Sequence, residues 1–293
     1  MAKIAVSSEE HRERTETNST SSPPRRRQLA SGEGWSVSDV VCTSGPQDRP
    51  FEEQFFETCV AIVVGGTFQY RTSMGRDLMM PGAILLGNAG DCFTCGHEHS
   101  VGDRCISFSY TQEFCERFKD SAGLAKSRFK TPRLAPTRAL SPLVSKASEL
   151  LARADHGAFE EFGIQVLAQA IQMEPGIVRR RLSKLDPSSL ARVTRVVRMI
   201  DSDPEVPHNL NGLAQIARLS PYHFIRVFEE LTGVTPHQYL LRIRLRRAAI
   251  RFREESTNIS DIALGCGFGD VSNFNRTFRA EFGMSPRVYR SKT

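Results

Sequence analysis

The sequence predicts a multidomain α+β protein in which a small antiparallel β-domain with following helices precedes an all-helical domain. Two observations support this fold class. Residues 35–110 contain short alternating or β-branched runs that are broken by Gly and Pro, with no helical pattern between them. Residues 213–290 contain one short helical pattern twice, at a spacing of fifty residues. With 293 residues, the chain is long enough for two domains that each bury a core.

Composition and cysteine usage narrow the class of protein. The chain is 40% hydrophobic and 25% charged, which is typical of a globular protein. It contains no apolar run long enough for a transmembrane helix, and its first residues lack the apolar core of a signal peptide. Seven cysteines, an odd number, fit reduced thiols better than a disulfide framework. We therefore expect a cytoplasmic protein.

The N-terminal third is expected to be a short tail followed by a β-domain. Residues 1–33 are rich in Ser, Thr, Glu and Arg and are predicted to be disordered. Residues 34–112 are predicted to form an antiparallel barrel or sandwich, a fold that often encloses a ligand cavity. In its last strand, alternation places Ile106, Phe108 and Tyr110 on one face and the residues between them on the other. The expected strands are 35–41, 59–64, 67–71, 83–86 and 105–110.

Residues 113–187 are predicted to be a helical region. One amphipathic helix starts at Ser141-Pro142 and a second stripe of apolar residues starts at Phe159. These stripes can pack on the β-domain, on each other or on a second copy of the chain, so this region is a candidate for dimerisation. Residues 178–186, with Arg179-Arg180-Arg181, have the composition of a polar linker.

The repeat lies within residues 188–293. Each copy has a short helix, a tight turn and a second helix that begins after an N-cap residue, Ser220 or Asp270. This is the spacing of a helix-turn-helix motif, and we place the two motifs at about 210–233 and 259–283. A long basic helix after Thr235-Pro236 is expected to couple them rigidly. The fifty-residue offset relates Phe224 to Phe274, Arg226 to Arg276, Phe228 to Phe278, Gly233 to Gly283, Pro236 to Pro286 and Tyr239 to Tyr289.

Charge and helix geometry indicate nucleic acid as the partner. Residues 188–293 carry 16 Lys/Arg and 10 Asp/Glu, whereas residues 1–187 carry 23 of each, so the whole excess of +6 lies in the repeat region. A solvated surface on a protein-interaction bundle is the alternative. In a helix-turn-helix motif, the N-terminal end of the second helix reaches base edges. The outward residues there are Pro221, Tyr222, Ile225 and Arg226 in the first motif, and Val271, Ser272, Asn275 and Arg276 in the second.

The motifs of this region resemble the AraC/XylS-type DNA-binding domain. The match rests on Leu213-Ala214, Ser220, Phe224-x-Arg226-x-Phe228, Gly233-x-Thr235-Pro236 and Tyr239, and on Ile262-Ala263, Gly267-Phe268-x-Asp270, Phe274-x-Arg276-x-Phe278, Gly283-x-Ser285-Pro286 and Tyr289-Arg290. The resemblance implies seven helices whose two recognition helices enter successive major-groove segments of promoter DNA. It implies a transcription regulator rather than an enzyme, with RNA polymerase, a small-molecule or redox effector and a second copy of the chain as further expected partners. Ile225 stands at a position where a polar, base-reading residue is possible, so apolar contact with thymine methyl groups is expected there instead.

The β-domain resembles the cupin-like sensor domain of the same family. The residues that carry this likeness are Pro81–Gly90, which match its strand–turn pattern, and the position ahead of a DNA-binding domain adds to it. The resemblance implies a cupin-like antiparallel β-barrel that senses a signal.

Residues 91–105 contain three Cys and two His. A tetrahedral zinc site from Cys95, His97, His99 and Cys105 is one interpretation, because these are the ligand types that zinc prefers. A redox-sensing or soft-metal-sensing thiol is a second, and small buried cysteines with ordinary loop histidines are a third. A cupin-type metalloenzyme using His97 and His99 and an architectural DNA-binding protein are the remaining alternatives for the whole chain.

Overall fold

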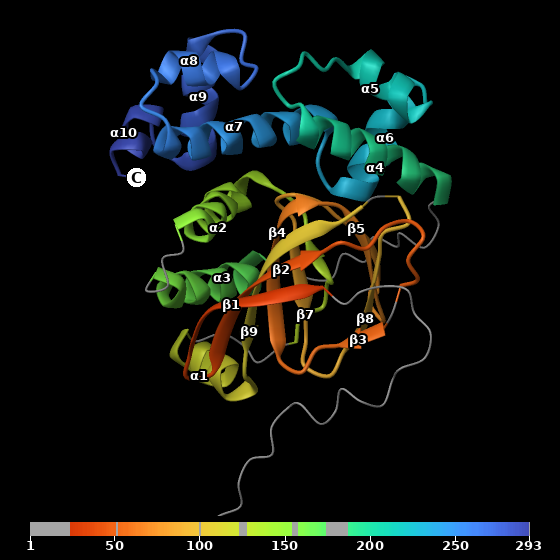
Figure 1. Ribbon diagram of the computed structural model, residues 1–293, viewed down its shortest axis with the longest axis vertical. Coiled ribbons are helices and arrows are strands. Elements are labelled where there is room, and N and C mark those ends of the chain that lie inside the picture. Colours follow the sequence, from red (N-terminus) through yellow and green to blue (C-terminus); the bar gives the residue numbers. More distant parts are fainter. Residues whose placement is uncertain are drawn as a thin grey trace, which may run out of the picture.

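The computed structural model of the chain describes residues 24–50, 52–99, 101–122, 128–153, 158–173 and 187–292. It places a β-domain with flanking helices beneath a C-terminal helical domain (Figure 1). The predicted linker at 178–186 and residues 1–23 of the predicted tail lie outside the described residues. None of the described helices has the length and apolar character needed to cross a membrane.

The β-domain consists of two antiparallel sheets. The six-stranded sheet has the order β1-β2-β9-β4-β7-β10 and the four-stranded sheet has the order β3-β8-β5-β6. No hydrogen-bonded pairing between described strands joins the two sheets, so the expected barrel is a pair of facing sheets and not a closed ring. The strands are β1 (Arg25–Gly32), β2 (Trp35–Cys42), β3 (Glu52–Gln54), β4 (Thr58–Gly66), β5 (Phe68–Thr72), β6 (Gly75–Met79), β7 (Ile84–Gly87), β8 (Cys92–Gly96), β9 (Asp103–Tyr110) and β10 (Arg133–Leu134).

The prediction that residues 1–33 are disordered is wrong for residues 25–32. These residues form β1, which pairs antiparallel with β2 from Arg25 opposite Val41 to Gly32 opposite Trp35. The composition of this segment does not predict a strand, because β1 lies at the edge of the sheet and most of its side chains are exposed. Only Leu29 among them is buried, so the segment carries almost no apolar signal.

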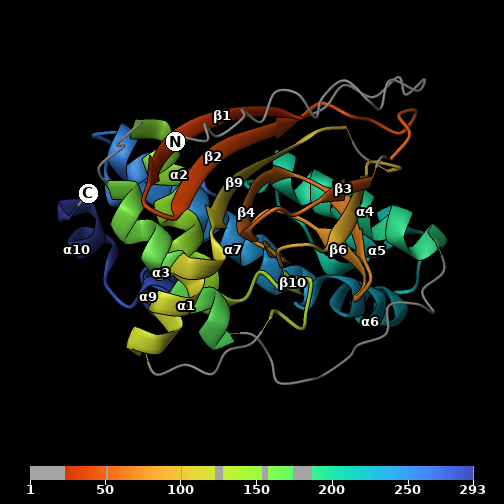
Figure 2. The same ribbon diagram turned by 90° about the horizontal axis from the view of Figure 1, so that it is seen from below.

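Three helices cover the outer face of the six-stranded sheet (Figures 1 and 2). They are α1 (Gln112–Ala122), α2 (Ser141–Arg153) and α3 (Phe159–Met173). The apolar face of β9 lies beneath them: the Phe108 and Phe162 rings are 5.6 Å apart, and the Tyr110 hydroxyl donates to the Gly163 carbonyl at 2.7 Å. The predicted apolar stripes of this region are therefore largely buried within one chain.

The C-terminal domain has the seven helices that the resemblance implies. They are α4 (Pro187–Ser202), α5 (Leu210–Ala217), α6 (Pro221–Thr232), α7 (Pro236–Glu254), α8 (Ile259–Gly265), α9 (Val271–Phe282) and α10 (Pro286–Ser291). The two helix-turn-helix motifs lie at the opposite ends of α7 (Figure 1). Helix α7 begins with a capping box between Thr235 and Gln238, which fixes its start.

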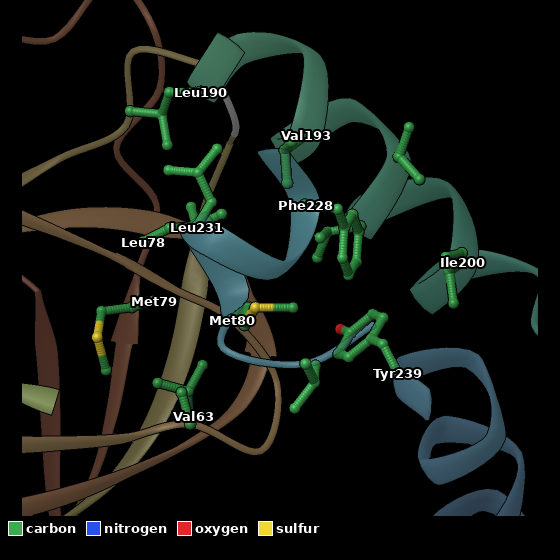
Figure 3. Close-up of a cluster of buried hydrophobic side chains, with 14 of the residues drawn as sticks. Val63, Leu78, Met79, Met80, Leu190, Val193, Ile200, Phe228, Leu231 and Tyr239 are labelled. Atoms are coloured by element: carbon green, nitrogen blue, oxygen red, sulfur yellow. The ribbon is translucent and has the colours of Figure 1, made fainter. Parts of the chain in front are cut away.

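The first motif shares a hydrophobic core with the β-domain. Figure 3 shows Met79, the last residue of β6, and Met80, which follows it, in one cluster with Leu231 of α6 and Tyr239 of α7. A single cluster of buried side chains thus runs from the sheets into α4, α6 and α7. The two predicted domains are therefore packed together and are not separate bodies on a free linker. Other members in the figure are Val63, Leu78, Leu190, Val193, Ile200 and Phe228.

Helix α7, which joins the two motifs, carries six arginines. All six of its arginines have partners inside the protein, because α7 is covered on several sides and a buried guanidinium must be hydrogen-bonded. Arg253 pairs with Glu149 of α2 at 2.8 Å, and both side chains are more than 90% buried. The other pairs join Arg242 to Glu281, Arg244 to the Pro204 carbonyl, Arg246 to the Pro81 carbonyl, Arg247 to Glu205 and Arg251 to Glu255.

Two aromatic residues of α6 provide a test of this packing. Phe228 is fully buried in the shared core, whereas Tyr222 is 80% exposed on the same helix. Phe228→Ala is expected to lower the free energy of unfolding by about 3–5 kcal/mol, and Tyr222→Ala to change it by less than about 0.5 kcal/mol. Urea denaturation followed by circular dichroism measures both. Equal losses in the two variants would contradict the assigned packing.

Candidate nucleic-acid interface and inner cavity

The first helix-turn-helix motif is held by local backbone contacts. Asn209 caps α5 by accepting a hydrogen bond from the Gly212 amide at 2.8 Å. The turn passes through Arg218, which has a left-handed φ of 52°, and the Leu219 amide returns to the Ala214 carbonyl at 3.0 Å. The Ser220 hydroxyl then accepts from the amide three residues later, so α6 begins where the sequence predicts.

The second motif uses a glycine in its turn. Gly267 has a φ of 87°, and a Cβ there would lie 2.7 Å from the Glu205 carbonyl oxygen, so a larger residue would be strained and crowded. Asp270 caps α9, because its Oδ1 accepts from the Asn273 amide at 2.6 Å. The negative charge of this cap also lies favourably at the positive end of the helix.

Every residue predicted to read DNA lies at the N-terminal half of α6 or α9. Six of the eight are exposed, and the two aliphatic residues, Ile225 and Val271, are half-buried. Arg276 donates to the Asn273 side-chain oxygen at 3.1 Å, which leaves the rest of its guanidinium facing outward. The exposed six are Pro221, Tyr222, Arg226, Ser272, Asn275 and Arg276.

Comparison with known proteins agrees with this geometry. Residues 213–292 match a family described as a helix-turn-helix domain. They form an AraC-type DNA-binding domain. The chain is 32% identical over 115 residues to a probable transcriptional regulator, LumQ, of Photobacterium leiognathi, covering 39% of this chain and 46% of LumQ. It is 40% identical over 82 residues to the transcriptional activator RhaS of Escherichia coli, covering 28% of this chain and 30% of RhaS.

The match spans less than half the length of either of these curated relatives. Among solved structures, the DNA-binding domain of AdpA, described as a global transcriptional factor in complex with a target DNA, is 28% identical. That comparison covers 34% of this chain and 91% of the AdpA chain, with a TM-score of 0.34.

A cavity of about 510 Å³, partly open to solvent, lies between the two sheets of the β-domain. The face of β9 opposite to its apolar face lines this cavity with Cys105, Ser107 and Ser109. Stacked Phe55 and Phe93 rings, 4.1 Å apart, form part of the wall. Four of the seven cysteines of the chain border this cavity: Cys42, Cys59, Cys95 and Cys105.

The structure groups His97 with residues other than those predicted. The His97 Nε2 lies 2.6 Å from Asp103 Oδ2, and Cys42, His97 and Asp103 have donor atoms within 4.8 Å of one another. No other group of three or more possible metal ligands is this close within the described residues. The predicted set of Cys95, His97, His99 and Cys105 is therefore not assembled.

Strand geometry explains the difference. His97 follows β8 directly and is buried, whereas His99 lies in the next turn, so the two histidines do not share a strand face. Cys42 joins His97 through the pairing of β2 with β9, which places Cys42 opposite Asp103. The alternating pattern at 35–41 predicts β2, but nothing in the sequence identifies β9 as its partner.

The same grouping changes the acidity of two side chains. For His97, burial favours the neutral ring, but hydrogen bonds to Asp103 and Cys42 outweigh it and raise its pKa to about 9. For Cys42, burial opposes ionisation, but hydrogen bonds from His97 and Ser44 lower its pKa. Burial instead raises the pKa of Cys95 and of Cys105. The pKa of Cys42 is therefore shifted downward, whereas the pKa values of these two other cavity thiols are shifted upward.

The cap of α9 provides a test of the second motif. Asp270→Ala removes the acceptor of the Asn273 amide and is expected to destabilise the protein by about 1 kcal/mol. Asp270→Asn is the matched control, because Asn caps helices about as well as Asp. Chemical denaturation of the two variants measures the difference. An Asn variant as unstable as the Ala variant would mean that charge, and not the cap, is responsible.

Proposed function

We propose that this protein is a sequence-specific DNA-binding transcription regulator whose β-domain senses a signal. The observation that carries the proposal is the pair of capped helices, α6 and α9, which present exposed polar residues at the two ends of one rigid helix. A helix presented in this way can enter the major groove with its N-terminal residues against base edges. Double-stranded promoter DNA is the partner, and the cytoplasm is the proposed location.

The two motifs are proposed to read DNA by different chemistry. Ser272, Asn275 and Arg276 of α9 offer hydrogen-bond donors and acceptors, which suit base edges or phosphates. In α6, Arg226 is the charged reader, while the exposed ring of Tyr222 and the half-buried Ile225 offer apolar contact to thymine methyl groups. Preference for particular bases is thus expected to differ between the two half-sites.

Regulation is proposed to follow from the packing of the sensor domain against the DNA-binding domain. Phe68, Ala61 and Leu85 line the cavity and also belong to the hydrophobic cluster that includes α4, α6 and α7. A ligand that favours one arrangement of the sheets would therefore favour one placement of the first motif. RNA polymerase and a second copy of the chain are proposed as further partners.

The enzyme alternative is not supported by the geometry. A cupin-type oxygenase site needs His97 and His99 on one open metal, but His99 is not in the only close ligand group of the described residues. The reported relatives are named transcriptional regulators.

Two arginines test DNA reading. Arg226→Ala and Arg276→Ala are each expected to weaken binding to the preferred DNA site by about 1–3 kcal/mol if they contact bases, with relaxed preference at separate positions of the site. Fluorescence anisotropy with the preferred site and with single-base variants measures both effects. Arg117→Ala is the matched control, because this exposed arginine lies on α1, away from both motifs.

Three outcomes are informative. A uniform loss across all sequences would mean that the two arginines contact only phosphate. An Arg117→Ala variant that loses as much affinity would mean that net charge alone drives binding. A wild-type protein without preference among sequences would instead favour the architectural alternative.

A further inference from the structure

The residues Cys42, His97 and Asp103 form a cluster that lies outside α6 and α9. They come from three separate places in the fold. Cys42 ends β2, His97 follows β8 and Asp103 begins β9. Cross-strand pairing sets Cys42 directly opposite Asp103, and the loop after β8 brings in His97 from the other sheet. Three donor atoms of different types, a sulfur, a nitrogen and an oxygen, thereby lie within 4.8 Å of one another.

The cluster is held in place before any ligand arrives. The His97 side chain is 2% exposed and that of Asp103 is 7% exposed, so neither is free to rotate into solvent. The second carboxylate oxygen of Asp103 accepts from the Cys105 thiol at 3.5 Å. Phe68 lies against the His97 ring, with 5.9 Å between centroids. Supporting contacts of this kind orient the ligands of metal sites.

All three side chains border the 510 Å³ cavity. A donor set of one thiolate, one imidazole and one carboxylate suits a borderline-soft divalent ion, and zinc sites with three protein ligands keep a fourth position for water or another molecule. Here that fourth position would open toward the cavity. Calcium and magnesium, which prefer oxygen ligands, do not suit this set.

We propose that Cys42, His97 and Asp103 bind a thiophilic divalent cation, with zinc as the reference ion, and leave one coordination position open to the cavity. The binding site itself stands independently of DNA binding. The further step, that the ion is the signal or helps to hold it, rests on the proposed function.

The wall of the cavity connects this site with the DNA-binding domain. Cys105 and Phe68 contact the cluster and belong to the same buried hydrophobic cluster as Phe228 of α6. Binding of an ion would tie β2, β9 and the loop after β8 together, and so stiffen the sheets on which the first motif packs. The structure thereby offers a physical route from metal occupancy to DNA affinity.

The test is metal titration of the full-length protein, prepared reduced and free of metal. Zinc is added in competition with a chromogenic chelator, and cobalt is used as a spectroscopic probe. We expect one ion per chain and a thiolate-to-cobalt charge-transfer band. Cys42→Ser should abolish the band and weaken zinc binding at least roughly 100-fold, since loss of a mere supporting residue already costs about 10–100-fold.

Two variants serve as matched controls. Cys92→Ser removes an exposed thiol that is outside the ligand group, and His99→Gln removes the neighbouring histidine of the sequence-predicted set. Both should bind zinc as the unchanged protein does. If His99→Gln or Cys95→Ser abolishes the cobalt band while Cys42→Ser retains it, the proposed ligand set is overturned. Retention of the band in all four variants would equally overturn it, because the ion would then bind elsewhere.

Two further measurements distinguish loss of the metal site from misfolding and test whether the ion regulates DNA binding. Circular dichroism of Cys42→Ser must match the unchanged protein, and His97→Gln supplies a second loss of ligand if it does not. DNA binding is then measured with and without zinc. Zinc binding at this site with no change in DNA affinity would overturn the role of the ion as a signal and leave the site intact. Failure to bind DNA in either state would overturn the proposed function alone.

Discussion

Helix α7 is the element on which the rest of this molecule depends, because the arginines that it buries need partners elsewhere in the protein. A guanidinium taken out of water is strongly destabilising without a partner. Arg253 meets Glu149, Arg242 meets Glu281, and Arg246 reaches the Pro81 carbonyl. These partners lie in α2, in α9 and beside the β-domain. The charges of α7 therefore specify how three parts of the chain fit together.

The pairing of the α7 arginines bears on the proposed binding of DNA. The net excess of basic residues lies in the C-terminal domain. Within α7, Arg242, Arg246 and Arg253 are largely buried, whereas Arg247 and Arg251 stay partly exposed. Arg226 and Arg276, in the N-terminal halves of α6 and α9, are exposed, and under the proposed function they would add to the attraction to phosphate.

The sequence predicts the local structure well and the long-range pairings poorly. Caps at Ser220 and Asp270, and the alternation of 105–110, depend on neighbouring residues and are visible as patterns. β1 is missed because an exposed edge strand has no apolar signature. Cys42 is missed as a partner of His97 because fifty-four intervening residues separate them and only the pairing of β2 with β9 unites them. Metal and ligand sites built across strands share this difficulty.

The side of β9 that faces the cavity carries groups suited to binding a ligand. A sheet that served only stability would turn its most apolar face toward its partner sheet. Here β9 does the reverse: Ile106, Phe108 and Tyr110 face the covering helices, while its thiol and hydroxyl groups face the cavity. Polar groups in a pocket give a ligand its orientation and specificity. The helices α2 and α3 thus cover the apolar face of β9, while its polar face is available to a ligand in the cavity.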